Sequence, residues 1–234
     1  MEQDRNNTED SSTLLMGEML LFGLLGRVLY AQLDHAWLQQ LIAEDVFGEA
    51  PFGMKKPEVK EGLRLLQAWS AKNRNGISQA DFLNLQADYT RLFVGVGRVL
   101  APLWESVYFN ENRMVFHEQT LQVRKWFRRF NLEAEKMNAE PDDHIGLEMT
   151  FVAHLANLAL KVLDQGDHEK LEEYLEAQRD FLSQHLLKWG PAWCNLVEEQ
   201  AHTDFYKGLA KLTRGALHAA AEWLNIEIPR EFAL

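Results

Sequence analysis

The spacing of the apolar residues constrains the fold of this chain more than any other feature. From Leu14 to Leu29, large apolar side chains return every three or four residues, which places them on one face of an α-helix. Strict alternation of apolar and polar residues, the pattern of a half-buried strand, is scarce. We therefore predict an all-α fold, a single globular bundle of about nine helices. The predicted helices lie near residues 14–29, 34–44, 57–72, 78–94, 117–130, 142–165, 168–186, 190–200 and 203–225.

Local signals mark several of the predicted helix starts. Ser78 is a suitable N-cap for the helix that opens with "QADF", because its hydroxyl can accept a free backbone N–H. Pro57, Pro141 and Pro191 lie where a first helical turn accepts proline, since the N–H that proline lacks is not needed there.

Two breaks interrupt the helical pattern, at residues 95–114 and 131–143, and both contain turn-forming residues. We predict a flexible N-terminus at residues 1–12 and one helical domain over 13–234. Its N-terminal part runs to about residue 131 and its C-terminal part starts at about 142. The hinge between these two subdomains also permits a domain-swapped dimer, although a monomer is expected.

The charge balance excludes one class of partner. The formal net charge of −11 argues against nucleic acid, because phosphate binding needs a basic surface. An acidic surface fits a basic ligand or peptide, but the same charge also serves solubility alone. Hydrophobic residues make up 47% of the chain, which is enough for a sizeable core.

Cysteine usage and the N-terminal residues indicate a cytoplasmic protein. Cys194 is the single cysteine, so no intrachain disulfide can form, and its apolar neighbours indicate a core residue. The first twelve residues are polar and acidic, whereas a secretory signal begins with basic residues. The longest uninterrupted apolar run, Met19–Gly26, is much shorter than the roughly 20 residues that span a bilayer, so we expect no stable membrane insertion.

The stretch "AEPDDHIGLEMTFVAHLA" places charged groups at the start of a long apolar helix. Asp142 and Asp143 fit the first helical turn, where carboxylates satisfy free N–H groups and complement the helix dipole. His144 and Glu148 are one turn apart and face the same way, as two metal ligands would. A zinc site needs at least three protein ligands, however, and no third one is near in the sequence. General acid–base chemistry by Asp143 and His144 stays open on residue type alone.

Known catalytic and phosphate-binding motifs are missing from the sequence. The residues "HEQT" fail to form a HExxH zinc motif because Leu121 replaces the second histidine. The residues "GVGRVL" begin like a dinucleotide-binding loop, but Leu100 replaces the last glycine. No P-loop and no GxSxG motif is present.

Aromatic residues beside acidic ones indicate a groove for an apolar peptide that carries basic residues. Alone, such aromatics are more often core than surface. The candidates are Tyr89, Leu92 and Phe93 on one helix side and Trp104 and Tyr108 after the glycine break, with Glu105, Glu111, Asp142 and Asp143 as a negative rim.

Several blocks of sequence resemble the TorD/DmsD/NarJ family, which are cytoplasmic maturation chaperones of molybdenum-containing redox enzymes. The blocks run in order from about residue 85 to 213, and the tryptophan-serine-valine-tyrosine block favours the DmsD/TorD branch. They read "YTRLFVG", "PLWESVYF", "FHEQTLQVRKWF", "EPDDHIGLEMTFVAHL" and "HLLKWGPAWCNLVEEQAHTDFYKGLAKLT".

The resemblance implies an all-helical, non-enzymatic chaperone. Its partners would be the twin-arginine signal peptide and the apo form of a molybdenum-containing reductase, which it holds until the cofactor is inserted. It implies no resident cofactor; some members bind guanine nucleotide, although this chain has no P-loop. Carried over by motif, the peptide-binding residues are Asp143 and His144, with Pro141, Glu148 and the aromatic-side residues Tyr89, Leu92, Phe93, Trp104 and Tyr108.

Two other classes stay open on the sequence. One is an all-α metal-dependent enzyme that uses His144 and Glu148, with no further metal ligand identified. The other is a purely structural adaptor.

Overall fold

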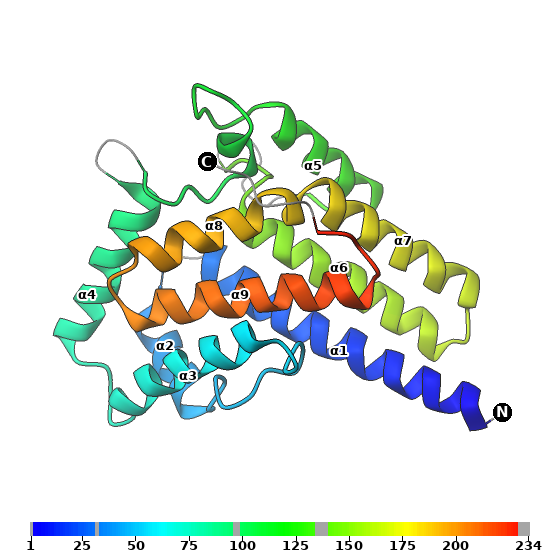
Figure 1. Ribbon diagram of the computed structural model, residues 1–234, viewed down its shortest axis with the longest axis horizontal. Coiled ribbons are helices and arrows are strands. Elements are labelled where there is room, and N and C mark those ends of the chain that lie inside the picture. Colours follow the sequence, from blue (N-terminus) through cyan, green and yellow to red (C-terminus); the bar gives the residue numbers. More distant parts are fainter. Residues whose placement is uncertain (1, 31–32, 96–98, 134–139, 229–234) are drawn as a thin grey trace.

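The structure, a computed structural model, describes residues 2–30, 33–95, 99–133 and 140–228, and the side chains from residue 10 onward (Figure 1). These residues form nine α-helices, one π-helical turn and one 3-10 turn, and they contain no strand, which confirms the all-α prediction. The helices are α1 (Glu2–Tyr30), α2 (His35–Ala43), α3 (Pro57–Lys72), α4 (Gln79–Tyr89), α5 (Glu118–Arg129), α6 (Ile145–Asp164), α7 (His168–Gln184), α8 (Leu186–Gln200) and α9 (Asp204–Trp223), with the short turns η1 (Thr90–Val94) and η2 (Glu105–Tyr108).

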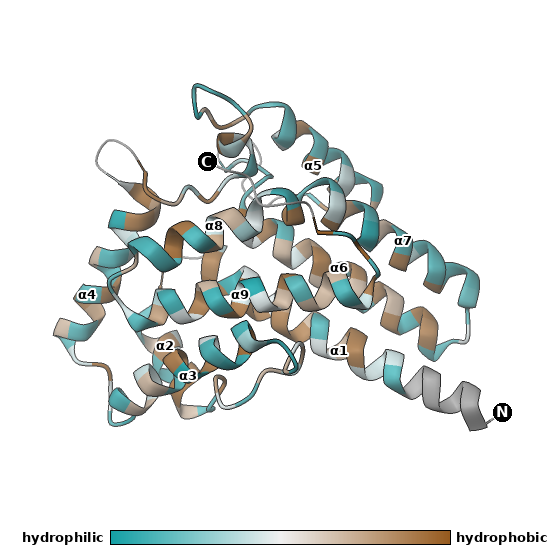
Figure 2. Ribbon diagram, in the orientation of Figure 1, coloured by the Kyte–Doolittle hydropathy of each residue, from teal (hydrophilic) through white to brown (hydrophobic). Residues whose placement is uncertain are grey.

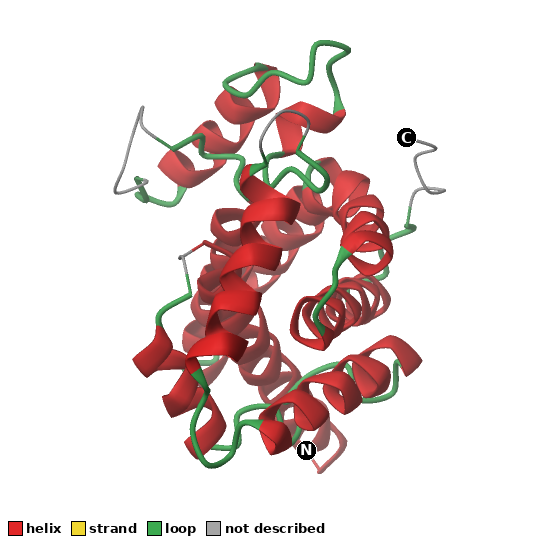
Figure 3. Ribbon diagram, turned by 90° about the vertical axis from the view of Figure 1, so that its left-hand side faces the viewer, coloured by secondary structure: helices red, strands yellow, loops and turns green. Residues whose placement is uncertain are grey.

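Two long helix pairs build the bundle. Helix α1 packs along α6, which is flanked on its other side by α7, while α3 packs along α9, which is flanked by α8. Helix α5 and η2 pack together above α6 and α8 in the view of Figure 1. A second view, turned by 90°, shows the same helices with loops joining their ends (Figure 3). Both pairs join an N-terminal helix to a C-terminal one, so the two predicted parts of the chain share one core, and their division into subdomains stays a prediction.

The polarity of each helix follows its place in the bundle. Helix α6 is mostly apolar along its whole length, whereas α5 and α7 carry many polar residues on their outer sides (Figure 2). Twelve of the twenty residues of α6 are buried. Helices α1 and α6 are each long and apolar enough to cross a membrane, but half of the α1 window and 61% of the α6 window are buried inside the protein. That burial comes largely from their contact with each other.

Glycines allow α1 and α6 to approach closely where α6 begins. A Cβ atom on Gly26 would lie 2.8 Å from the carbonyl oxygen of Gly146. A Cβ atom on Gly146 would lie 2.7 Å from the carbonyl oxygen of Gly26 and from the nitrogen of Tyr30. The start of α6 is therefore fixed against the end of α1.

Some predicted helix starts are confirmed and others are wrong. The Ser78 hydroxyl accepts the Asp81 N–H as the N-cap of α4, and Pro57 is the first residue of α3. Pro191, in contrast, lies inside α8, which begins at Leu186. Pro141 precedes α6 by several residues and is not in its first turn.

Three further predictions concern the N-terminus, the helix over 78–94 and the hinge over 131–143. Residues 2–12, for which we predicted a flexible N-terminus, are helical in α1. The predicted helix over 78–94 changes from α-helical to π-helical at Thr90. The predicted hinge over 131–143 lies partly outside the described residues, which stop at 133 and resume at 140.

Candidate functional site

Backbone hydrogen bonds join the aromatic segment "PLWESVYF", residues 102–109, to the residues at the start of α6. The N–H of Glu105 donates to the carbonyl oxygen of Asp143 at 2.9 Å, and the N–H of Ile145 donates to that of Leu103 at 2.8 Å. These bonds form an isolated antiparallel bridge between Trp104 and His144. Two regions about forty residues apart in the sequence thus form one site.

Asp143 is fully buried and joins three elements. One carboxylate oxygen accepts the backbone N–H of Ser106 in η2 at 2.7 Å, and the other accepts the hydroxyl of Thr120 in α5 at 2.6 Å. Both oxygens are therefore occupied inside the protein. The prediction that Asp143 belongs to an exposed negative rim is wrong, because burial leaves no part of it accessible.

Asp142 is also buried rather than part of the rim. Its carboxylate accepts a hydrogen bond from Nε of Arg124 in α5 at 2.8 Å and forms an ion pair with Nη2 of the same guanidinium at 2.7 Å. The prediction that Asp142 and Asp143 lie in the first turn of the helix is wrong, because both precede α6, which starts at Ile145. Both aspartates bind α5 or η2 instead of capping α6.

His144 is the N-cap of α6, a role that histidine seldom has and that the sequence therefore did not indicate. Its Nδ1 accepts the N–H of Gly146 at 3.0 Å, so the ring is neutral. Burial lowers the pKa of His144 to about 3, which keeps it neutral at physiological pH. The rings of Tyr30 and Trp104 meet it edge to face, with centroids at 5.3 and 5.7 Å.

Deeper in the protein, Glu148 and Glu105 form a second polar group with residues of α8 and its N-terminal junction. The indole N–H of Trp189 donates to Glu148 at 3.3 Å, and Glu105 pairs with Nδ1 of His185 at 2.8 Å. Burial raises the pKa of Glu148 well above its ordinary value, and the nearby carboxylates of Glu105 and Asp143 add to the rise. Burial also raises the pKa of Glu105, despite its partner His185. Glu105, predicted for the rim, is therefore an interior group, and that part of the prediction is wrong.

The predicted aromatic residues differ in how far they reach the surface. Tyr89, Trp104 and Tyr108 are half-buried, so each keeps an accessible edge. The indole N–H of Trp104 donates to Glu140 at 2.8 Å, and the hydroxyl of Tyr108 donates to the carbonyl oxygen of Pro102 at 2.9 Å. Burial raises the pKa of Tyr89, and the negative charge of Glu140 adds to the rise.

Three other predicted residues are buried and do not reach the surface. Leu92 and Phe93 are 0% and 1% exposed, and Pro141 is buried as well. The Phe93 ring stacks on Trp193 at 6.1 Å and meets Tyr206 at 5.5 Å. Leu92 and Phe93 belong to the core, and the Phe93 ring also meets the ring of half-buried Tyr89 at 5.2 Å.

An exposed apolar patch lies on the loop that follows η2. Met114, Val115 and Phe116, together with Leu121 at the start of α5, are between 38% and 55% exposed. Glu111, the fourth predicted rim residue, is exposed on the same loop. Large apolar side chains gathered on a surface commonly mark an interaction site.

The sequence missed several residues of the site. Glu140 was within the quoted motif but not selected, and its position beside the proline was a usable signal. Thr120, Arg124 and Trp189 bind the motif from distant segments, His185 binds Glu105, and no local pattern marks any of them. Among the described residues, no group of three His, Cys, Asp or Glu side chains is arranged to hold a metal ion.

Comparisons with known proteins give a consistent result. The family model described as nitrate reductase delta subunit matches residues 55–195. A probable Tat proofreading chaperone DmsD from Haemophilus influenzae is 26% identical over 206 residues, which cover 88% of this chain and 91% of the relative. The Tat proofreading chaperone DmsD of Salmonella typhi is 29% identical over 60% of each chain. A chaperone protein TorD from Vibrio cholerae is 33% identical over 61% of this chain and 63% of the relative.

Proposed function

The chain belongs to the nitrate reductase delta subunit family, as the resemblance to TorD and DmsD implied, and we propose that it is a cytoplasmic chaperone for a molybdenum-containing oxidoreductase. In this proposal it binds the twin-arginine signal peptide of that enzyme and assists its folding, cofactor insertion and export. The similar proteins are named as chaperones and not as enzymes, so family membership favours a non-enzymatic role and gives no support to the metal-dependent alternative.

One observation carries the proposal: the carboxylate of Glu140 is bound by the half-exposed ring of Trp104, beside the buried polar groups of Asp143 and His144. Trp104 binds this carboxylate directly, and Tyr89 lies within its electrostatic influence. An arginine of the peptide would form a charge-assisted hydrogen bond with Glu140 and stack on the aromatic edges. His144 and Asp143 act indirectly, by holding in place the segment that contains Trp104. His144 does so through the backbone bridge, and Asp143 through its hydrogen bond with Ser106.

The apolar part of the signal peptide needs an accessible apolar surface. Leu92 and Phe93 do not provide it, because both are buried. The patch of Met114, Val115, Phe116 and Leu121 is accessible and lies between the loop after η2 and the first turn of α5. We assign the apolar stretch of the peptide to this patch, which extends the binding face beyond the residues predicted from the sequence.

The proposal also covers the oligomeric state of the chaperone, its protein partner and its cofactor. We propose that the chaperone acts as a monomer on the apo form of the reductase, without a cofactor of its own. Neither nucleic acid binding nor membrane insertion is part of the proposed role, in keeping with the net charge of −11.

Titration calorimetry with a twin-arginine signal peptide of a molybdenum-containing reductase tests the proposal. We expect micromolar or tighter binding and a clear loss of affinity when both arginines of the peptide are replaced by alanine. The matched protein variant is Glu140→Gln, which keeps the shape of the side chain and removes its charge. It should weaken binding by about 1–3 kcal/mol, the range for a charged hydrogen bond. Equal affinity for both peptides would contradict the proposed function.

A further inference from the structure

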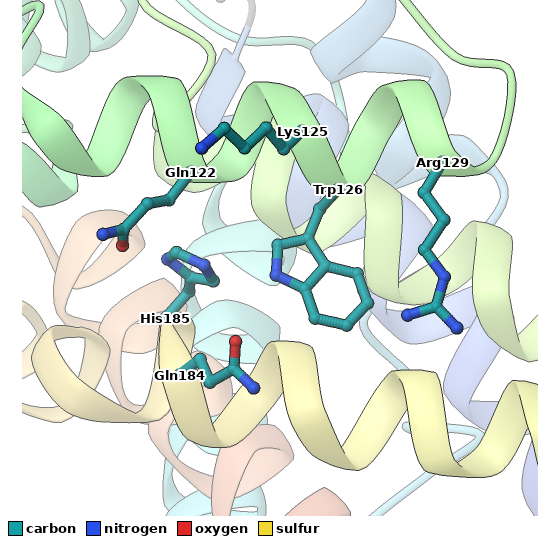
Figure 4. Close-up of a pocket in the computed structure, with 6 residues that line it drawn as sticks. All are labelled: Gln122, Lys125, Trp126, Arg129, Gln184 and His185. Carbon is teal, nitrogen blue, oxygen red and sulfur yellow. The ribbon is translucent and has the colours of Figure 1, made fainter.

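A pocket lies between α5 and the junction of α7 and α8. Its volume is about 290 Å³, at the lower end of the range for ligand-binding pockets. The lining side chains are Gln122, Lys125, Trp126, Arg129, Gln184 and His185 (Figure 4). None of them belongs to the proposed peptide-binding face.

His185 is a built component of this pocket. Figure 4 shows its imidazole directed from the helix junction toward α5, near Gln122 and Trp126. The side chain is 1% exposed, and its Nδ1 is held by Glu105 at 2.8 Å. His185 lines the pocket, and no described residue forms a hydrogen bond with its other ring nitrogen, Nε2. The hydrogen bond to the Glu105 carboxylate fixes the orientation of the imidazole at the edge of the pocket.

The charges around the pocket are opposite in sign to those of the chain as a whole. Helix α5 carries four cationic residues and one acidic residue, although the net charge of the protein is −11. Arg124 is neutralised by Asp142, but Lys125 and Arg129 form no ion pair within the described part of the chain. Their side chains give the pocket two cationic donors that suit an anion.

One wall of the pocket is flat and apolar. The Trp126 ring is held from behind by Phe151 and Phe181, with centroids at 6.5 and 5.9 Å. The guanidinium of Arg129 lies 5.3 Å from the centroid of the same ring. This fixed wall can stack against a planar group, while the amides of Gln122 and Gln184 border the opening.

We propose that this pocket is a binding site for an oxyanion, a carboxylate or a phosphate, carried on a small planar molecule. The oxyanion accepts hydrogen bonds from Lys125 and Arg129 beside the imidazole of His185, and the planar body lies on Trp126. Glu105 is a positioning residue that orients the imidazole through Nδ1. The inference does not depend on the proposed chaperone function, because neither the pocket nor its ligand involves the signal peptide.

Nuclear magnetic resonance titration of the full chain with benzoate and phenyl phosphate tests this site. Both probes should shift the indole resonance of Trp126 in a saturable way, and the tighter of the two identifies the preferred oxyanion. Benzamide, which has the shape of benzoate but no charge, should bind at least roughly tenfold more weakly, as expected for the loss of charged hydrogen bonds.

Two variants separate the pocket from general charge effects. The double variant Lys125→Gln and Arg129→Gln keeps the buried pair of Glu105 and His185 intact and should reduce affinity roughly tenfold or more. The matched control Arg128→Gln removes an exposed charge from the same helix outside the pocket, and it should bind like the unmodified chain. The proposal is overturned if neither probe shifts Trp126 at millimolar concentration, if benzamide binds as tightly as benzoate, or if the double variant keeps full affinity.

Discussion

Asp143 shows why a conspicuous acidic residue in a motif need not touch the ligand. Its two oxygens satisfy donors in η2 and α5, and its own backbone carbonyl accepts from Glu105. We predict that Asp143→Ala lowers the free energy of unfolding by about 2–4 kcal/mol, because the N–H of Ser106 and the hydroxyl of Thr120 lose their buried acceptor. Chemical denaturation measures this loss.

The Glu140→Gln variant is the contrasting case at the same scale. Glu140 is half-buried and contributes a single hydrogen bond, to Trp104, which a glutamine oxygen can still accept. Its denaturation midpoint should therefore stay close to that of the unmodified chain, while peptide affinity falls. If Asp143→Ala unfolded at the same denaturant concentration as the unmodified chain and lost only peptide affinity, Asp143 would have to contact the peptide directly.

At the scale of elements, the crossing of α1 and α6 determines where the motif is held. We predict that Gly26→Ala destabilises the protein by about 1–3 kcal/mol, the usual cost of overpacking, because the new Cβ would lie 2.8 Å from the Gly146 carbonyl and 3.0 Å from the Thr150 nitrogen. Gly23, one turn earlier in α1, is the matched control: its Cβ would meet Ala153 at an ordinary 3.9 Å.

Gly23→Ala should leave stability unchanged or raise it by up to about 1 kcal/mol through helix propensity. Thermal unfolding of the two variants side by side checks the pair. Equal melting temperatures for both would mean that the helices can separate at the crossing without cost, and the close approach would then not fix the start of α6.

At the scale of elements, the periodicity of apolar residues predicts which helices exist but not all of their boundaries. It predicts the existence of all nine α-helices within the described residues, because each buries an apolar stripe. The sequence pattern fails at Pro191. The adjacent Gly190 and Pro191 predict a helix boundary there, whereas α8 begins at Leu186. There the buried side chains of Trp189 and Trp193 keep α8 continuous, and packing outweighs the missing N–H. It also fails at the start of α6, since His144 is an unusual N-cap.

At the scale of the whole molecule, the sequence predicted which segments meet but not which side chains face outward. The motif and the aromatic segment do lie together, with Trp104 bridged to His144. Leu92 and Phe93 share a helical turn with Arg91, yet helical spacing cannot show that this side faces α8 and α9. Contacts between residues far apart in sequence decide exposure, and these require the three-dimensional arrangement.

The overall charge leads to a prediction about ionic strength. A chain with a net charge of −11 attracts a peptide with paired arginines over distances that salt shortens, since the screening length falls from about 30 Å at 0.01 M to about 8 Å at 0.15 M. We expect affinity for the twin-arginine peptide to decrease steadily as sodium chloride is raised across this range in calorimetric titrations. The peptide with both arginines replaced by alanine should respond far less, because its remaining contacts with the apolar patch of Met114, Val115, Phe116 and Leu121 are not screened. An affinity for the twin-arginine peptide that does not change with salt would assign recognition to the aromatic and apolar surfaces alone, with Glu140 contributing no attraction to the arginines.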